Sequence, residues 1–400
     1  MNLHCGGRGP LSHLTVIEMA GLGPGPFAGM VLADFGAKVI RVDRASSATA
    51  WGPKRTESPV SRGRHSIAVN LKDPGGIALV LELVAKADIL IEGFRPGVME
   101  RLGLGPQICH DRNARLIYGR ITGWGQHGPL SQAAGHDLNY ISLSGALHAM
   151  GSKDRPPPPP LNLLGDYGGG AMLLLVGILA ALAEAQRSGR GQVVDAAMSD
   201  GAALLMAAQY GLQASGSWHE ERGSNFLDGS AHFYATYECA DGRYISVAPL
   251  EPQFYKELLE LCGVDDPHFD KQWEKSEWPA LQQKFTELFR SRSRAQWCDL
   301  LEGADACFAP VLSMNEAPHH PHNVARGTFV EVEGLLQPAP APRLDRTPGS
   351  VPPRAPQVGQ HTADVLKELG RSESEIEALI RAGIVHSAPA AARHEEGGFR

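Results

Sequence analysis

The first 45 residues contain a strand–loop–helix–strand pattern, and this pattern constrains the fold more than any other feature of the sequence. Apolar runs at residues 14–19 and 38–43 predict strands, and residues 27–35 have the spacing of a helix. A glycine-rich loop at residues 21–26 joins the first strand to the helix. Strand, helix and strand in succession form a βαβ unit, which is parallel and right-handed. The chain therefore begins with the elements of a Rossmann-like sheet.

The alternation of helix and strand continues over the next 80 residues. Helical periodicity recurs at residues 77–87 and 97–102, and short apolar runs at 89–91 and 116–121 predict further strands. Such alternation is typical of an α/β fold, in which helices cover both faces of a parallel sheet. Hydrophobic residues make up 43% of the chain and charged residues 20%, so a wholly disordered or fibrous chain is excluded.

The middle of the chain is predicted to be helical from about residue 166 to about residue 213. This region includes the longest apolar run, residues 171–183, which is interrupted by Gly177. The run is shorter than the roughly 20 residues that a membrane-spanning helix needs. We therefore interpret it as a buried helix and expect no membrane span.

A second unit follows a boundary rich in Gly, Ser and Trp at residues 215–228. Asp241 and Gly242 separate two apolar runs and indicate a hairpin, after which helical periodicity returns. The sequence thus predicts an α/β protein with a Rossmann-like parallel sheet in a large domain and a smaller α+β domain. The expected bounds are 11–215, completed by 330–385, for the large domain, 226–318 for the small domain and 386–400 for a disordered tail.

Charge and cysteine content exclude several classes of function. The chain has 37 Lys and Arg against 44 Asp and Glu, a net charge of −7, so no overall field favours nucleic acid. Its six cysteines are scattered, which argues against a disulfide scaffold or a zinc site and for a reducing compartment. The N-terminus lacks the apolar core of a signal peptide, and the C-terminus is not Ser-Lys-Leu. We expect a cytoplasmic protein without a metal.

Basic residues gather locally despite the negative total. Between residues 38 and 72 there are eight basic and two acidic residues, a local balance of 8 − 2 = +6. Guanidinium groups pair with phosphate, so such a cluster beside a βαβ loop suits a polyphosphate ligand, although a solvated basic face explains it equally well. Arg95 follows a strand end, where α/β sheets bind ligands. The eight basic residues are Lys38, Arg41, Arg44, Lys54, Arg55, Arg62, Arg64 and Lys72.

The loop at residues 21–26, Gly-Leu-Gly-Pro-Gly-Pro, has part of the dinucleotide-binding fingerprint. Asp43 lies about twenty residues beyond it, where such a fold binds ribose. However, Pro26 occupies the third glycine position, and proline has no N–H to donate to a pyrophosphate. A nicotinamide dehydrogenase is therefore disfavoured, and the loop is interpreted as a wall for another nucleotide-bearing ligand.

Three ionisable residues have sequence contexts that fit either catalysis or ordinary structure. His136 stands where a helix begins, and backbone N–H groups there can stabilise a developing anion. Asp166 precedes the apolar helix, where an aspartate is most often an N-cap. Glu251 follows a strand and fits a first-turn acid that complements a helix dipole. None of the three is decisive alone, and the histidine-rich segment at residues 319–322 is interpreted as a loop.

Several long motifs, taken in order, resemble the family III CoA-transferase superfamily, and in particular its members that racemise 2-methylacyl-CoA thioesters. The similarity extends from about residue 11 to about residue 385. It implies the family fold, with a large and a small domain, and an interlocked homodimer whose active sites are shared between chains. The motifs lie at residues 23–28, 33–44, 134–140, 162–170, 225–230, 233–237 and 251–255.

The resemblance also implies residue roles. His136 and Asp166 match the two acid/base residues, Glu251 of the partner chain supports His136, and the amide N–H of Asp137 binds an enolate oxygen. The acyl-CoA substrate brings its own CoA, and no other cofactor is expected. The positions that match the CoA-binding residues are Arg44, Val69, Asn70, Leu71, Lys72, Arg95, Gly135, Leu138, Asn139 and Tyr140.

The activity implied is interconversion of (R)- and (S)-2-methylacyl-CoA by 1,1-proton transfer through an enolate, as part of fatty-acid metabolism. Two groups on opposite faces of the α-carbon can do this without a metal or nicotinamide. The alternative is a CoA-transferase of the same fold, in which Asp166 acts as a nucleophile and forms an anhydride and then an enzyme thioester. A catalytically silent CoA-binding protein is a third interpretation.

Overall fold

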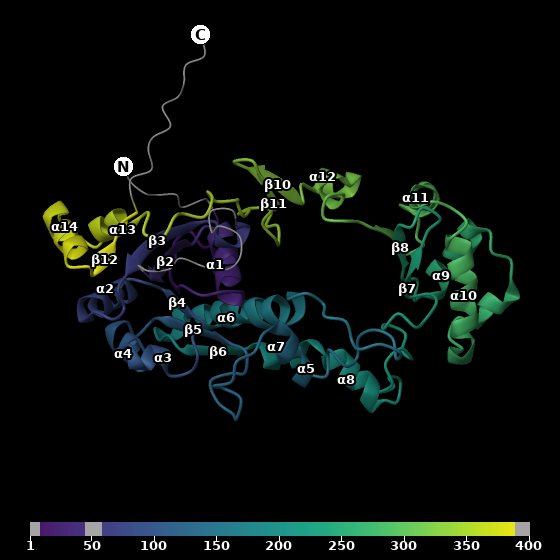
Figure 1. Ribbon diagram of the computed structural model, residues 1–400, viewed down its shortest axis with the longest axis horizontal. Coiled ribbons are helices and arrows are strands. Elements are labelled where there is room, and N and C mark those ends of the chain that lie inside the picture. Colours follow the sequence, from purple (N-terminus) through teal and green to yellow (C-terminus); the bar gives the residue numbers. More distant parts are fainter. Residues whose placement is uncertain (1–8, 45–57, 389–400) are drawn as a thin grey trace, which may run out of the picture. The chain divides into compact units, whose positions relative to one another are not determined.

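The computed structural model describes residues 9–44 and 58–388 (Figure 1). The chain divides into two compact units. The large unit comprises Met1–Ile141, Leu161–Leu204 and Gly327–Arg400, and the small unit comprises Ser142–Pro160 and Leu205–Arg326. Residues 142–160 and 205–215, which the sequence interpretation assigned to the large domain, are grouped with the small unit. Of the predicted tail, residues 389–400 lie outside the described residues.

A seven-stranded sheet forms the centre of the large unit, with the strand order β12-β3-β2-β1-β4-β5-β6. The mixed α/β architecture with a large parallel sheet confirms the predicted fold class. All neighbours pair in parallel except β12, which is antiparallel to β3. The strands are β1 (Thr15–Met19), β2 (Lys38–Arg44), β3 (Arg64–Val69), β4 (Ile89–Glu92), β5 (Ile117–Thr122), β6 (Val193–Ala197) and β12 (Val385–His386).

Apolar side chains on the two faces of each central strand enter two separate cores. In β1, Val16 packs into one core while Ile17 packs into the other; in β2, Val39 and Ile40 divide in the same way. A strand buried on both sides needs helices above and below it, as parallel sheets have. Side chains of α1 (Pro24–Asp34) and α6 (Leu173–Ser188) fill one core. Those of α2 (Pro74–Val84), α13 (Thr362–Glu368) and α14 (Glu373–Arg381) fill the other.

The helices of the large unit begin at recognisable signals. Proline occupies the first turn of α1 and α2, Asp73 caps α2 by accepting a hydrogen bond from Gly75 N–H (2.8 Å), and Ser372 with Glu375 forms a capping box on α14. The helices are α1 (Pro24–Asp34), α2 (Pro74–Val84), α3 (Val98–Arg101), α4 (Pro106–Arg112), α5 (Asp137–Leu143, shared with the small unit), α6 (Leu173–Ser188), α7 (Met198–Leu205), α13 (Thr362–Glu368) and α14 (Glu373–Arg381). A hairpin of β10 (Phe329–Val332) and β11 (Leu335–Pro338) completes the unit.

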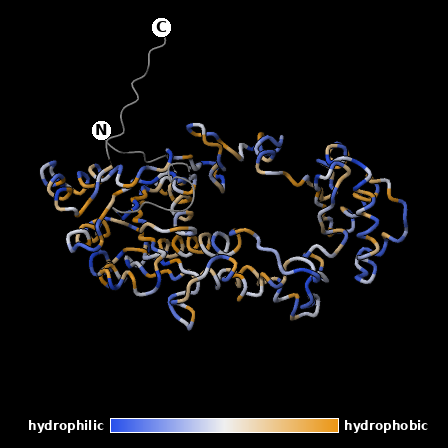
Figure 2. The backbone as a smooth tube through the Cα atoms, in the orientation of Figure 1, coloured by the Kyte–Doolittle hydropathy of each residue, from blue (hydrophilic) through white to orange (hydrophobic). Residues whose placement is uncertain are grey.

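The apolar helix predicted in the middle of the chain is α6, preceded by a π-helical segment, Leu163–Met172. Figure 2 shows it as a hydrophobic coil. Together the two form the one described helical stretch that is long and apolar enough to cross a membrane by length and composition. In this structure Leu174, Leu175 and Ile178 are buried in one of the two cores that cover the sheet. On this face, the apolar side chains of α6 therefore pack against the sheet.

Two of the parallel strands in the large sheet differ from the sequence prediction. The prediction of continuous helix over residues 166–213 is wrong at β6, which pairs with β5 at the edge of the sheet. β6 is short, and the pairing that makes it a strand is a tertiary contact that local periodicity does not reveal. β3 was not predicted because it begins with Arg64 and His65, and the charge of Arg64 is neutralised only in the folded chain.

The small unit contains a three-stranded antiparallel sheet covered by helices. The predicted hairpin at Asp241 and Gly242 is present as β7 and β8. The elements are α8 (Ala207–Ala214), β7 (Ala235–Glu238), β8 (Tyr244–Val247), α9 (Pro252–Cys262), α10 (Trp278–Phe289), α11 (Arg294–Leu301), β9 (Phe308–Val311) and α12 (Pro321–Arg326), together with short 3-10 turns.

A histidine lies at the centre of the aromatic core of this unit. His232 is fully buried among Phe233, Phe269 and Phe285, and its Nε2 is 2.7 Å from the hydroxyl of Tyr255. Its Nδ1 has no hydrogen-bond partner among the described residues. Burial lowers the pKa of His232 from 6.5 to about 4, because the aromatic surroundings disfavour the imidazolium.

We expect acid to destabilise the small unit through His232. Between pH 6.5 and 4 the unfolded chain binds a proton that the folded unit does not, so stability falls as the pH falls through this range. The loss is at most about 3 kcal/mol. Hydrogen exchange of the β7 and β8 amides against pH measures it. In His232→Gln the pH dependence over this range should flatten, and an unchanged slope would contradict this assignment.

Candidate active site

A cavity of about 550 Å³ opens at the carboxyl ends of the central strands. Here the order of the sheet reverses, because β2 lies on one side of β1 and β4 on the other. Ligands bind at such switch points in open α/β sheets. The cavity is lined by Met19, Gly21, Leu22, Pro24 to Pro26, Ile91 to Pro96, Ile121 to Trp124, Ser131, Ala133 to His136, Asn139, Tyr140 and Met198.

Asp166 lies on the first turn of the π-helical segment. It is half-buried, and desolvation raises the pKa of its carboxyl group, with the nearby charge of Asp137 acting in the same direction. The side-chain amide of Asn162 donates to Asp166 Oδ2 (3.3 Å) and opposes the rise. The electrostatic interaction with His136 also opposes the rise. A raised pKa makes a carboxyl group a stronger base, which suits a group that has to accept and return a proton.

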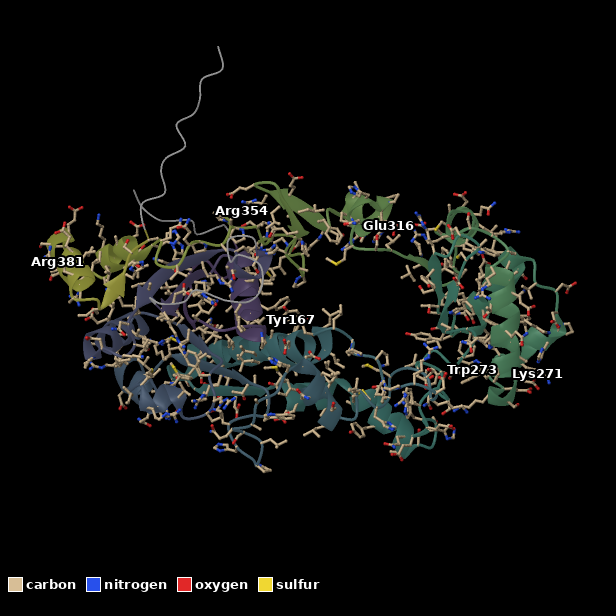
Figure 3. The ribbon with its side chains drawn as sticks, viewed as in Figure 1. Tyr167, Lys271, Trp273, Glu316, Arg354 and Arg381 are labelled. Atoms are coloured by element: carbon tan, nitrogen blue, oxygen red, sulfur yellow. The ribbon has the colours of Figure 1, made fainter. Side chains whose placement is uncertain are left out.

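The glycine-rich loop lies directly against this carboxyl group. Gly23 has φ +67°, and a Cβ atom there would lie 3.2 Å from Asp166 Oδ2. A side chain at this position would therefore need both a left-handed backbone and room that the carboxylate occupies. Beside it, the ring of Phe27 on α1 stacks on that of Tyr167, with the ring centres 4.5 Å apart. Figure 3 labels Tyr167.

The carboxylate of Asp137 connects α5 to the π-helical segment. Its Oδ2 accepts hydrogen bonds from the backbone N–H groups of Gly165 and Asp166, each at 2.6 Å. Asp137 is buried, and its Oδ1 has no hydrogen-bond partner among the described residues. These two bonds fix Asp166 relative to the start of α5, where His136 stands. The structure thus brings His136, Asp137 and Asp166 together.

The turn before α5 forms one wall of the cavity. His136 N–H donates to Asn139 Oδ1 (3.0 Å), and the hydroxyl of Tyr140 donates to the carbonyl of Gly135. The ring of Tyr140 packs edge-on against Trp124 at 4.8 Å. The side chain of His136 itself is exposed, and His136 lines the cavity. A group bound in the cavity can therefore reach the imidazole.

The residues predicted to bind CoA fall into three sets. Arg95, Gly135, Asn139 and Tyr140 line the cavity, whereas Leu138 is exposed beside them on α5. Arg44 is the last residue of β2, and its Cζ lies 5.7 Å from the centre of the Phe94 ring. Phe94 lines the cavity. The third set, Val69, Asn70, Leu71 and Lys72, forms the end of β3 and the turn into α2.

Within this third set only some groups are accessible. Val69 is buried in the core and Leu71 packs against it, so a ligand could meet Val69 only through its backbone. Asn70 Oδ1 accepts a hydrogen bond from Lys72 N–H (3.1 Å). The side chain of Lys72 is exposed.

The interpretation of the whole basic cluster as a phosphate site is corrected by the structure. Arg41 and Arg64 bind the buried carboxylate of Glu18, and Arg62 binds Asp34. Lys38 pairs with Glu368 on α13. These four side chains neutralise acids that lie far from them in sequence, which a count of local charge cannot reveal. Lys54 and Arg55 lie outside the described residues, and phosphate binding by Arg44 and Lys72 stays a prediction.

Asp43 does not have the surroundings of a ribose-binding acid. It is buried, and its carboxylate accepts hydrogen bonds from Arg41 Nε (3.1 Å) and Ser66 Oγ (2.6 Å). Both oxygens are thus used inside the sheet. This engagement removes the feature on which the nicotinamide interpretation rested.

Glu251 belongs to the small unit. It is the exposed N-cap residue of α9, and its side chain makes no capping hydrogen bond to the helix. Its predicted support of His136 from a partner chain stays a prediction. The sequence reasoning missed Asn162, although an amide four residues before Asp166 on a helical turn shares its face.

Comparison with known proteins identifies the family of this chain. The family model described as CoA-transferase family III matches residues 11–362. Two curated relatives, both named alpha-methylacyl-CoA racemase, are 46% identical (Mus musculus) and 43% identical (Homo sapiens) over 94% of this chain and 98% of their own. The crystal structure of a CAIB/BAIF family protein from Brucella suis superposes with a TM-score of 0.79 at 26% identity, covering 90% of this chain and 99% of that one. The chain belongs to CoA-transferase family III.

Proposed function

We propose that this protein is a 2-methylacyl-CoA racemase that acts by proton transfer at the α-carbon of a thioester. One observation carries the proposal: an imidazole and a carboxyl group of raised pKa, His136 and Asp166, are joined through Asp137 beside a cavity at the switch point of the sheet. The mouse and human relatives are both named for this reaction, which supports the assignment. A branched acyl thioester fits fatty-acid metabolism.

The reaction needs one group to remove the α-proton from one face and another to supply a proton to the opposite face. We assign these steps to His136 and Asp166, which exchange roles according to the epimer bound. The electron pair left on the α-carbon moves onto the thioester oxygen, and the amide N–H of Asp137 donates to this enolate oxygen. Protonation of the α-carbon then restores the carbonyl. Because ordinary imidazole and carboxylate are weak bases toward such a proton, placement and desolvation supply much of the catalysis.

We assign the CoA moiety to the cavity and its rim. Arg95 is exposed beyond the carboxyl end of β4, and Arg44 lies over the ring of Phe94. Lys72 is exposed in the turn between β3 and α2. Guanidinium and ammonium groups suit the phosphates of CoA. The cavity then holds the pantetheine arm, which leads the thioester to His136 and Asp166.

We also assign a second copy of the chain to the outer face of α6. Met172, the last residue of the π-helical segment, is followed at helical spacing by Val176 and Leu179 of α6, and the three are 44%, 60% and 46% exposed. An exposed apolar stripe of this kind marks an interaction surface. A homodimer covers it, and the same assembly supplies the partner's small unit as the source of Glu251.

The alternative activity is CoA transfer between carboxylic acids, with Asp166 as nucleophile. The family name supports this alternative. The pairing of Asp166 with a second acid/base group, His136, favours racemisation, because covalent transfer needs no second base across the substrate.

The test is to incubate one epimer of a 2-methylacyl-CoA in deuterated water. Racemisation gives both epimers with deuterium at the α-carbon. A parallel reaction supplies a free carboxylate acceptor, and the control is the protein denatured by heat. If CoA moves to the acceptor without deuterium entering the α-carbon, the transferase assignment replaces this one. If neither occurs across a panel of acyl groups, the chain only binds CoA.

A further inference from the structure

A buried ionic cluster lies beneath the glycine-rich loop. Its centre is the carboxylate of Glu18, the fourth residue of β1, which is completely buried. One oxygen pairs with Arg41 of β2, and the other accepts a hydrogen bond from Arg64 Nε of β3 at 2.9 Å. Three neighbouring strands thus each contribute one charged side chain to a single point of the sheet.

Each of the two arginines also donates a hydrogen bond to a carbonyl at one end of the segment formed by residues 21–26. Their other N–H groups bind elsewhere: Arg41 Nε donates to Asp43, and Arg64 Nη1 donates to the carbonyl of Arg62. Arg41 Nη2 donates to the carbonyl of Gly21 (3.2 Å), and Arg64 Nη2 donates to the carbonyl of Pro26. Gly21 is the first residue of the loop, and Pro26 lies in the first turn of α1, which begins at Pro24 and follows the loop directly. The fork of a guanidinium group allows one arginine to bind the carboxylate and a loop carbonyl together.

Between the two held ends, the loop touches the reacting carboxyl group. The backbone of Gly23 lies against Asp166 Oδ2, and Phe27, one residue beyond the loop, stacks on Tyr167 next to Asp166. The loop therefore excludes water from one side of the carboxyl group whose protonation the reaction needs.

We propose that Arg41 and Arg64, oriented by Glu18, are positioning residues that press the glycine-rich loop against Asp166. This proposal rests on the proposed function, in which Asp166 accepts and returns the α-proton. It assigns a role to basic residues that local charge suggested were phosphate ligands. Neither arginine acts on substrate; each acts through the loop backbone.

A purely structural salt-bridge cluster would stabilise the sheet without affecting Asp166, so the experiment needs a matched control. Arg62 supplies one. It is buried like Arg41, and it donates to Asp34 and to a backbone carbonyl, that of Pro338 (2.9 Å), rather than to the loop. The variants Arg41→Lys and Arg62→Lys both keep the charge and remove the fork.

The first readout is independent of activity. Hydrogen exchange is measured at the amides of Gly21, Leu22, Gly23 and Gly25, and the rate at which a carbodiimide and an amine modify Asp166 is followed by mass spectrometry. We expect Arg41→Lys to speed both by roughly 10-fold over the wild-type protein, and Arg62→Lys to leave both within about 2-fold. If the two variants behave alike, the proposal is wrong. Arg64→Lys tests the other end of the loop if Arg41→Lys does not fold.

The second readout is the pH profile of α-proton exchange. Besides the loop, Asp137, His136, Asn162 and Tyr140 interact with Asp166, and neither variant alters these groups. In Arg41→Lys the loosened loop should admit water to Asp166 and so lower the pKa of its carboxyl group. The limb of the pH profile that reports ionisation of Asp166 should then move to lower pH, and kcat should fall roughly 10- to 100-fold. Arg62→Lys should keep the limb in place. A wild-type protein without exchange would refute the proposed function but leave the first readout able to decide this inference.

Discussion

Asp166→Asn is expected to lower the rate of racemisation by about 10³-fold or more, while the affinity for CoA changes little. General acid–base groups contribute about 10²- to 10⁴-fold, and the amide of asparagine can neither accept nor return the α-proton. The side chains have similar shapes, so the hydrogen bonds from Gly165 and Asp166 N–H to Asp137 should persist. Conversion of each epimer is followed by separation on a chiral column.

The two-base assignment also predicts which of the two epimers can still exchange its α-proton in each variant. In Asp166→Asn the epimer whose proton faces His136 should still exchange that proton with solvent deuterium and keep its configuration. The other epimer should not exchange. The matched variant, His136→Ala, should show the opposite preference. If both epimers exchange equally in Asp166→Asn, a single base serves both faces and the assignment fails; a transferase would show exchange in neither.

The fold was predictable where local pattern and tertiary environment agree. In β1 and β2 the apolar residues serve two buried faces, so runs such as residues 14–19 identify the strands from sequence. In β3 the pattern breaks at Arg64, whose charge is neutralised by Glu18, a partner 46 positions earlier. β6 was missed because its neighbour β5 lies more than 70 residues away. Pairings over such distances leave no periodicity in the sequence.

The candidate site, like the fold, was predictable only where a local motif identifies the residue. Asp166 and His136 stand in motifs that the resemblance identifies, and the structure brings them together. The contacts that tune Asp166 come from Asp137, 29 residues earlier, and from a loop more than 140 residues earlier. Neither contact has a local signature. The interpretation of Arg41, Arg62 and Arg64 as phosphate ligands was wrong for the opposite reason. Their charges are local in sequence, but the carboxylates of Glu18 and Asp34 that bind them are not.

The segment that carries Asp166 depends on a close backbone contact, which leads to the second large prediction. Gly169 of the π-helical segment lies against Gly201 of α7. A Cβ atom at Gly201 would lie 1.8 Å from the carbonyl oxygen of Gly169 and 2.5 Å from its carbonyl carbon. Because the obstacle is backbone rather than a flexible side chain, one of the two helices has to move.

We expect Gly201→Ala to lower the free energy of unfolding by about 3 kcal/mol or more, and to reduce racemisation further by displacing Asp166. The matched variant is Gly211→Ala on α8, where a Cβ would meet no described atom within 4 Å. Alanine favours a helix over glycine, so Gly211→Ala should raise stability by about 0.5–1 kcal/mol. Urea unfolding of both proteins measures the difference. Equal stabilities would mean that the two helices do not touch through these glycines, and α7 would then have no part in holding Asp166 at the cavity.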